Sequence, residues 1–453
     1  MSGLELVPFV HEGLGNSSYL LHVGQGRAAL VDPDRTIERY MEALEDREWL
    51  LVAVFETHLH ADFLSGSLEA SQATGATLHL PSAGAAKFEH RGLAPGDRVE
   101  LGEVEIEAIA SPGHTPEHLS YVVRSDDEPP MLFSGGALIV GGAARTDLIA
   151  PEMTESLTRA EFRTLRDAFA ELPDETGLFP THGGGSFCSV ARDGDRSSTL
   201  GEERRSNPLL ATQDEEMFVH SFPSTFPAVP AYFSRMRALN QAGPRLRDTI
   251  DPPRPLSVGS SERAMREGAL LIDVRSRERY GRAHVHGSLS IPFRDVFALW
   301  LGWLAPADTT LLFVADGMDL DQVMDECLLV GYERFAGYLD GGIASWTAAG
   351  KAVSTIEVVD PRRAARALEG GAVPLDVREP DEFDRGHIGD AVHIPLGFLE
   401  GGIGDLPVGK PVLAYCGGGD RASTAASILE RAGVSPVLNL DGGFDAWEGR
   451  GPG

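Results

Sequence analysis

The sequence predicts an α/β protein of several domains whose N-terminal part and C-terminal half have different architectures. The chain has 453 residues, 42% of them hydrophobic, which is enough for roughly two to four domains with separate cores. The C-terminal half contains an internal repeat, which predicts two copies of one domain. The N-terminal part instead reads as strand pairs with glycine turns and interspersed helices.

The two repeated segments share three motifs in the same order. Residues 271–275 read LIDVR and residues 375–378 read LDVR; residues 290–292 read SIP and residues 393–395 read HIP; residues 340–346 read DGGIASW and residues 441–447 read DGGFDAW. The spacing between copies is far longer than a solenoid unit, so each copy is a whole domain. Short Val/Leu/Ile runs alternate with helical stretches, such as residues 361–368, in the pattern of a parallel sheet covered by helices.

The N-terminal part has its predicted strands at residues 19–23, 28–31, 50–55, 104–108, 119–123 and 131–133. Residues 202–247 are polar and then rich in proline and phenylalanine, and we expect a helical extension that packs on the first domain. The predicted domains are therefore residues 1–205, a helical extension at 206–252, a first repeat at 253–353 and a second at 356–453.

Composition limits the function classes. The net charge of −29 argues against a nucleic-acid partner, because the phosphate backbone would be repelled. The N-terminus lacks a basic region followed by an apolar stretch, and no segment is apolar for long enough to predict a membrane span. Three widely spaced cysteines, Cys188, Cys327 and Cys416, favour a reducing compartment, so we expect a cytoplasmic protein.

Four histidines predict a metal site. Residues 57–62 read THLHAD directly after the apolar run 50–55, so His58, His60 and Asp62 lie where a buried strand ends. His114 and His182 follow other apolar runs, in the glycine-containing turns SPGHT (111–115) and FPTHG (179–183). Loop residues at strand ends are well placed to hold metal ligands, so these side chains are the predicted ligand set.

In this order, and with Arg145-Thr146-Asp147, these motifs resemble the metallo-β-lactamase superfamily and within it the persulfide dioxygenases. The resemblance implies an αββα sandwich with one Fe(II), held by His58, His114 and an aspartate at the position where this chain has Gly136. A zinc-type site formed by His58, His60 and His114, and a domain without metal, both stay open.

The sequence also predicts roles for three more residues near this site. Phe63 stands where the two-metal hydrolases of the superfamily have a histidine, which counts against such a hydrolase. Arg145 either pairs with Asp147 or meets an anionic thiol substrate. Cys188 resembles a cysteine of bacterial dioxygenase–rhodanese fusions that could carry a persulfide, and a small buried hydrophobe is an equally good interpretation.

A second chemical motif lies in the last repeat. Residues 412–423 read VLAYCGGGDRAS, which predicts a strand, a glycine loop and a helix that begins near Ala422. The N–H groups of the loop and the helix N-terminus point towards Cys416, and Arg421 adds a cation, so the loop favours a thiolate. The anion-binding residues expected beside Cys416 and Arg421 are Gly417, Gly418, Gly419, Asp420 and Arg378.

This loop, with LDVRE at 375–379 and DGGF at 441–444, resembles the rhodanese family. The resemblance implies that Cys416 takes a sulfane sulfur and carries it as a persulfide. Arg378 either helps to hold the anion or pairs with Asp376 or Glu379. The first repeat reads LFVADGMD at 312–319, without a cysteine, so it resembles an inactive rhodanese.

Together the two resemblances imply a sulfide-detoxification enzyme in which a dioxygenase domain oxidises a small thiol persulfide with O₂ to sulfite. A rhodanese would then exchange sulfur among persulfide, sulfite and thiosulfate. The alternatives are a sulfurtransferase with a degenerate N-terminal domain and a zinc thioester hydrolase of the glyoxalase type. The expected partners are these small molecules, with neither nucleic acid nor membrane, and a homodimer is left open.

Overall fold

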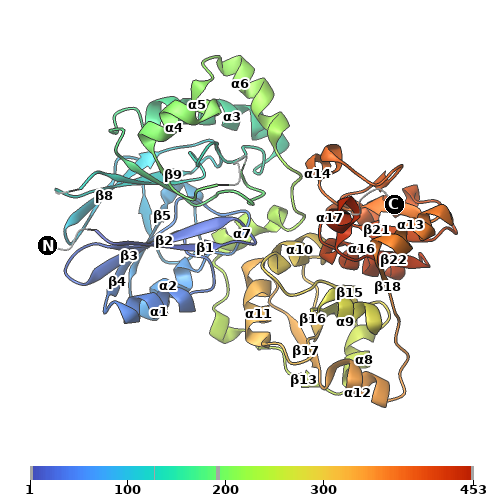
Figure 1. Ribbon diagram of the computed structural model, residues 1–453. Coiled ribbons are helices and arrows are strands. Elements are labelled where there is room, and N and C mark those ends of the chain that lie inside the picture. The colour runs from blue at the N-terminus through green and yellow to red at the C-terminus, as the bar shows by residue number, and fades with distance from the viewer. Residues whose placement is uncertain (1–3, 127, 190–193, 450–453) are drawn as a thin grey trace. The chain divides into compact units, whose positions relative to one another are not determined.

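The computed structural model describes residues 4–126, 128–189 and 194–449, in two compact units (Figure 1). The first unit comprises Met1–Ile250 with Asp325–Gly331, and the second comprises Asp251–Met324 with Tyr332–Gly453. None of the helices in the described residues is long and apolar enough to cross a membrane.

The first unit is built on two six-stranded sheets. The strands of one sheet are, in spatial order, β1 (Leu6–His11), β2 (Asn16–His22), β3 (Arg27–Val31), β4 (Leu50–Phe55), β5 (Thr77–Pro81) and β6 (Arg91–Leu93). Those of the other are β12 (Ser198–Thr199), β11 (Gly177–Pro180), β10 (Met131–Gly135), β9 (Leu119–Arg124), β8 (Val104–Ala110) and β7 (Arg98–Leu101). The strand predicted at residues 50–55 is observed with the same bounds, and the others differ by a few residues at their ends.

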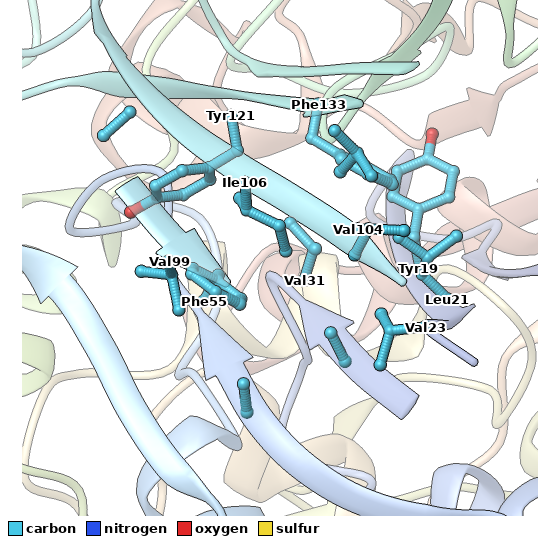
Figure 2. Packing of buried hydrophobic residues seen from close by; sticks show 14 of the residues in the cluster. Tyr19, Leu21, Val23, Val31, Phe55, Val99, Val104, Ile106, Tyr121 and Phe133 are labelled. Atoms are coloured by element: carbon cyan, nitrogen blue, oxygen red, sulfur yellow. The ribbon is translucent and has the colours of Figure 1, made fainter. Parts of the chain in front are cut away.

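The two sheets pack face to face around one hydrophobic core (Figure 2). Tyr19 and Phe55 from the first sheet meet Ile106, Tyr121 and Phe133 from the second, and all five are buried. Burial alternates along β8, which is the period expected when one face of a strand enters a core. This core fixes the two sheet edges from which the metal-site loops emerge.

Helices cover the outer face of each sheet. The first sheet is covered by α1 (Glu38–Asp46) and α2 (Ser67–Thr74), through side chains such as Tyr40 and Ala70. The second is covered by α3 (Thr154–Arg163), with α4 (Leu200–Ser206), α5 (Pro208–Ala211) and α6 (Glu215–Ser221). The layers are therefore helix, sheet, sheet, helix, which confirms the αββα sandwich implied by the resemblance.

The second unit contains two five-stranded sheets with identical topology. One has the order β13 (Pro255–Leu256), β17 (Phe335–Leu339), β16 (Leu311–Val314), β14 (Leu270–Asp273), β15 (Leu289–Ser290). The other has the order β18 (Glu357–Val359), β22 (Val437–Leu440), β21 (Val412–Tyr415), β19 (Val373–Asp376), β20 (Val392–His393). All neighbouring strands run parallel, so the internal repeat predicted from the sequence is confirmed as a repeated parallel α/β fold.

Corresponding helices surround the two sheets. Those of the first repeat are α8 (Val258–Arg266), α9 (Arg277–Arg282), α10 (Phe297–Leu304), α11 (Leu320–Leu329) and α12 (Gly342–Ala348). Those of the second are α13 (Pro361–Glu369), α14 (Pro380–Arg385), α15 (Leu399–Gly402), α16 (Asp420–Arg431) and α17 (Gly443–Glu448). The helix after the cysteine loop therefore begins at Asp420, two residues earlier than predicted, so the loop is shorter. Cys327, on α11, is buried.

Candidate metal centre and cysteine loop

The loop that carries His58 and His60 is fixed by a buried carboxylate. Asp32 directly follows β3 and accepts hydrogen bonds from the backbone N–H and the hydroxyl of Thr57, both at 2.7 Å. The hydroxyl of Thr181 donates to the same carboxylate. Asp32 thus ties the ends of two strands of the first sheet to the loop after β11, and the predicted histidines are brought together around it.

Three of these histidines are held through Nδ1. His58 Nδ1 lies 2.8 Å from the Thr57 hydroxyl, whose own proton goes to Asp32. His114 Nδ1 donates to the carbonyl oxygen of Arg145 at 2.6 Å. His182 Nδ1 lies 3.1 Å from the Asn16 side-chain oxygen and 3.2 Å from Asp62. With the proton on Nδ1, each ring presents the lone pair of Nε2, as metal-binding histidines do.

The three Nε2 atoms face a common point. His58 Nε2 and His182 Nε2 are 3.3 Å apart, and His114 Nε2 has no hydrogen-bond partner among the described residues. Two lone pairs facing each other at this distance repel unless a cation lies between them. Two nitrogens bound tetrahedrally to one ion at about 2.0–2.1 Å are separated by about 3.3 Å. These ligand atoms, all buried, therefore fit a metal ion.

His58 and His114 are in the form that a metal needs. Burial lowers the pKa of His114 to about 3 and holds the pKa of His58 well below its ordinary value. Both imidazoles are consequently neutral and free to donate electron pairs to an ion.

His60 is engaged elsewhere. Its Nε2 lies 2.9 Å from Glu56 and 3.4 Å from Asp32, and its ring stacks on Phe63 with the centroids 4.2 Å apart. Burial alone would lower the pKa of His60, but the two carboxylates outweigh it and raise the pKa to about 10. A protonated imidazole is no metal ligand, so this geometry favours His182 over His60 as the third nitrogen. Asp62 lies beside His182 and orients it.

The position of Gly136 leaves no room for a carboxylate as the loop now stands. A Cβ atom at Gly136 would lie 2.6 Å from the His114 ring and 3.0 Å from the Cβ of Ala144. The Gly136 N–H donates to His118 Nε2 at 3.0 Å, and the His118 ring stacks on His58. The place of the implied aspartate is thus occupied by packed imidazole.

Helix α7 (Phe233–Ala242), which belongs to the predicted helical extension, closes the site from one side. The Asn240 side chain donates to the carbonyl oxygens of His60 and Phe63, both at 2.9 Å, and the Tyr232 hydroxyl donates to that of Asp62 at 3.0 Å. This extension therefore anchors the histidine loop itself.

A cavity of about 210 Å³ lies between α7 and the metal-site loops. It reaches His114 and the Thr115 hydroxyl, which is buried and lacks a partner among the described residues. On the α7 side, Arg237 forms a two-pronged ion pair with Glu117. The remaining lining residues are Leu59, Ala61, Leu148, Ile149, Phe233, Ser234, Ala238 and Gln241. Such a mixture of apolar wall and a few polar groups suits a small organic ligand.

Arg145 and Cys188, both predicted to bind substrate, are buried. Arg145 donates to Asp147 at 2.7 and 2.9 Å and to the Phe187 carbonyl oxygen at 3.1 Å, which is the structural pairing considered from the sequence. The Cys188 thiol is fully buried, and burial together with the Asp62 carboxylate raises its pKa well above the ordinary value. A substrate role for either residue stays a prediction.

The cysteine loop has the geometry expected for an anion site. Cys416 lies directly after β21, and the Gly419 N–H donates to its sulfur at 3.0 Å. The carbonyl oxygen of Cys416 accepts from the Phe444 N–H at 2.7 Å, and that of Gly417 accepts from the Asp445 N–H at 3.3 Å. Because the N-terminus of α17 holds these carbonyls away from the sulfur, the loop can present N–H groups to it.

The two predicted arginines have fixed partners. Arg421 forms a two-pronged ion pair with Glu382, at 2.6 and 2.7 Å. Arg378 is buried, pairs with Asp376 at 2.6 Å and donates to the Gly386 carbonyl oxygen. The pair of Arg378 with Asp376 is one of those considered from the sequence. It stabilises the segment that follows β19.

Sequence reasoning missed Asn16, Asp32, Glu56, Thr57 and His118. Asp32 and Glu56 follow buried apolar runs without a break, a signal that marks polar residues at a sheet edge. Nothing in the sequence pairs Asn16 with His182, because their contact depends on two distant strands.

Comparisons with known proteins agree with this architecture. The model of the metallo-beta-lactamase superfamily matches residues 11–182, and that of the rhodanese-like domain matches residues 260–349 and 360–450. The persulfide dioxygenase ETHE1, mitochondrial, of Homo sapiens is 29% identical over 202 residues, 44% of this chain and 73% of that protein. A hydroxyacylglutathione hydrolase from Polaromonas sp. is 32% identical over 171 residues, 37% of this chain. This chain spans 62% of the hydrolase's length, less than two thirds.

Among solved structures, a metallo-beta-lactamase from Staphylococcus aureus subsp. aureus COL aligns with a TM-score of 0.66 and 26% identity. The alignment covers 74% of this chain and 99% of that one. The chain therefore belongs to the metallo-beta-lactamase superfamily through its N-terminal domain, and two rhodanese-like domains follow that domain.

Proposed function

We propose that this protein acts in sulfur metabolism, oxidising a small thiol persulfide in its first domain and transferring sulfane sulfur at Cys416. The observation that carries the proposal is the contact of the Gly419 N–H with the Cys416 sulfur, at 3.0 Å, in a glycine loop at the start of α16. A loop of this kind stabilises a thiolate and, after transfer, the terminal sulfur of a persulfide.

The sulfur-transfer step needs the chain's own residues and no cofactor. The Cys416 thiolate attacks the outer sulfur of thiosulfate, so that a new S–S bond forms, the S–S bond of thiosulfate breaks and sulfite leaves with the electron pair. A nucleophile such as cyanide then takes the sulfane sulfur and returns the thiolate. Glu382 holds Arg421 beside the cysteine loop. There the guanidinium contributes positive charge to the proposed anion site.

The first domain would convert RSSH, O₂ and H₂O into RSH and H₂SO₃. Its ion would be held by His58, His114 and His182, whose Nε2 atoms converge. Bound iron would supply the site at which the substrate sulfur and O₂ react. The chain's part is to orient the rings through Thr57, Asn16 and the Arg145 carbonyl, and to bind the thiol.

The cavity next to His114 is the proposed thiol pocket. Its apolar wall suits the carbon chain of the thiol, and the Thr115 hydroxyl offers a hydrogen bond close to the metal ligands. Arg237, at the α7 side, is partly exposed and can attract an anionic group while Glu117 holds it in place.

A thioester hydrolase is the second candidate, because hydroxyacylglutathione hydrolases are among the similar proteins. Such activity would use a metal-activated water in the same pocket. Against a second ion, Phe63 offers no donor where those hydrolases have a histidine, and His60 Nε2 is paired with Glu56 and Asp32.

Metal analysis of the full chain tests the first domain directly. We expect about one iron per chain after growth with iron, and O₂ uptake on adding glutathione persulfide. His182→Ala should lower metal affinity and O₂ uptake by at least about 10- to 100-fold, the loss that follows from removing even an outer partner of a ligand, because a ring nitrogen facing the ion is lost. The matched control is His220→Ala, which removes an exposed histidine on α6 and should change neither.

Full metal binding in His182→Ala would refute the ligand set. Zinc as the bound metal, with hydrolysis of a glutathione thioester and no O₂ uptake, would favour the hydrolase. A folded protein with neither metal nor either activity would leave sulfur transfer as the whole function.

A further inference from the structure

The first rhodanese repeat has no cysteine at its own strand end, yet one of its side chains reaches the cysteine loop of the second repeat. Arg277, the first residue of α9, donates through Nη1 to the carbonyl oxygen of Gly418. Its Nη2 donates to Asp441 at 3.0 Å, and its Nε donates to Glu278 at 2.9 Å. The guanidinium is therefore held by Glu278 of the first repeat and Asp441 of the second while it donates to the Gly418 carbonyl oxygen.

The peptide that Arg277 binds is the one that contacts the sulfur. The Gly418 carbonyl and the Gly419 N–H belong to the same planar trans peptide unit, so they point in opposite directions. Holding the carbonyl outward therefore turns the Gly419 N–H inward, to the Cys416 sulfur 3.0 Å away. We propose that Arg277 is a positioning residue for sulfur transfer, supplied by the inactive repeat. The inference rests on the proposed transfer at Cys416.

The other loop carbonyls do not need such help from the first repeat. Those of Cys416 and Gly417 are held by the N-terminus of α17, within the second repeat. Among the described residues, the carbonyl of Gly418 accepts no backbone hydrogen bond from that helix, and Arg277 is its donor. The peptide between Gly418 and Gly419, whose N–H contacts the Cys416 sulfur, therefore receives a hydrogen bond from the first repeat.

The sequence of the loop is adapted to this contact. A Cβ atom at Gly419 would lie 2.5 Å from Arg277 Nη1, and the φ angle of Gly419 is +106°. Only glycine tolerates both the close guanidinium and this backbone conformation. Arg277 has no counterpart in the second repeat, where Pro380 follows Glu379.

Further contacts hold the first repeat against α16. The Ser290 N–H donates to the Ser427 hydroxyl at 3.0 Å, and the Ser290 and Ser423 hydroxyls are 3.2 Å apart. Arg294 Nε lies 3.6 Å from Asp420, the first residue of α16. These contacts fix the helix whose N-terminus forms the sulfur site, so Arg277 approaches the loop from a defined direction.

The test measures thiosulfate-to-cyanide transfer and the pH dependence of Cys416 alkylation in the full chain. We expect Arg277→Ala to lower kcat/KM by about 10- to 100-fold, because the Gly419 N–H is no longer held towards sulfur. The midpoint of the pH profile for alkylation should rise by about one pH unit, which a loss of stability alone would not produce.

Two variants complete the design. Arg279→Ala removes a neighbouring, largely exposed arginine that faces Asp316 of its own repeat, and it should leave both measurements unchanged. Arg277→Lys keeps one donor but cannot bridge Gly418 and Asp441, so its activity should lie between wild type and alanine. It also serves as the test variant if Arg277→Ala does not fold.

Unchanged kcat/KM and an unchanged pH profile in a folded Arg277 variant would overturn the inference. Activity in Cys416→Ser would instead overturn the proposed transfer itself. The two failures are separate, because Cys416→Ser removes the nucleophile whereas the Arg277 variants change only the peptide beside it.

Discussion

The two rhodanese repeats share one framework and differ at the strand end that leads into the cysteine loop. In both, an aspartate at the end of a central strand pairs with the arginine two residues later, Asp273 with Arg275 and Asp376 with Arg378, each at 2.6 Å. After β21 the chain continues into Cys416 and three glycines. After β16 it continues into Ala315 and Asp316.

This difference determines what faces the N-terminus of the following helix. In the second repeat, α17 holds the carbonyl oxygens of Cys416 and Gly417. In the first, the Asp316 carboxylate lies against α12, close to Gly342, and pairs with Arg275 at 3.2 Å. A carboxylate thus lies at the place where the other repeat presents its cysteine loop. The shared framework stabilises both repeats, and the residues proposed for sulfur transfer lie in the loop of the second repeat alone.

The largest effect is expected from exchanging the residue at the strand end. Cys416→Ser should reduce thiosulfate-to-cyanide transfer by more than about 1,000-fold, because the nucleophile is lost. Ala315→Cys in that background should not restore it, since Asp316 would repel a thiolate at this position. Restored transfer in the double variant would show that the first repeat lacks only a thiol.

An intermediate effect should distinguish two matched glycines, with φ angles of +56° at Gly342 and +57° at Gly443. A Cβ at Gly443 would clash with the backbone oxygen of Gly417, which cannot move without the loop, whereas one at Gly342 would clash with a side-chain oxygen of Asp316, which can rotate away. We expect Gly443→Ala to lower kcat/KM about 100-fold by moving the loop. Gly342→Ala should cost about 1–2 kcal/mol of stability and leave transfer intact.

Calorimetry and transfer kinetics on the same preparations would check this pair. Equal losses of transfer in the two variants would mean that the α12 end of the first repeat also controls Cys416, so that the two repeats would not differ in this respect.

The smallest effect on transfer is expected from the shared framework. Asp273→Asn and Asp376→Asn each weaken the partner of a buried arginine, and each should cost about 3 kcal/mol of stability. In thermal unfolding the two variants should lose similar amounts. Transfer by folded Asp376→Asn should stay within about threefold of wild type, because Arg378 faces Asp376 and the Gly386 carbonyl. A much larger loss of transfer would assign Arg378 to anion binding.

The fold was largely predictable because its signals are local. Apolar runs gave the strand at residues 50–55 with its observed bounds, and the duplicated motifs gave two domains that share one strand order. Boundaries were less accurate, as at α16, which begins at Asp420. The N–H groups of Gly419 and Asp420 sit at a helix end whose position depends on packing as well as on local sequence.

The sequence by itself predicted which residues could carry chemistry, in motifs whose residue types suit a metal ion and a sulfane sulfur: His58, His60, Asp62, His114, His182 and Cys416. Only the tertiary structure decided that Glu56 and Asp32 form ion pairs with His60. It also decided that α7 anchors the histidine loop and that Arg277 donates to the Gly418 carbonyl oxygen. The reason is physical. A motif records side-chain type, whereas ligand choice and loop geometry depend on contacts between strands and helices far apart in the chain.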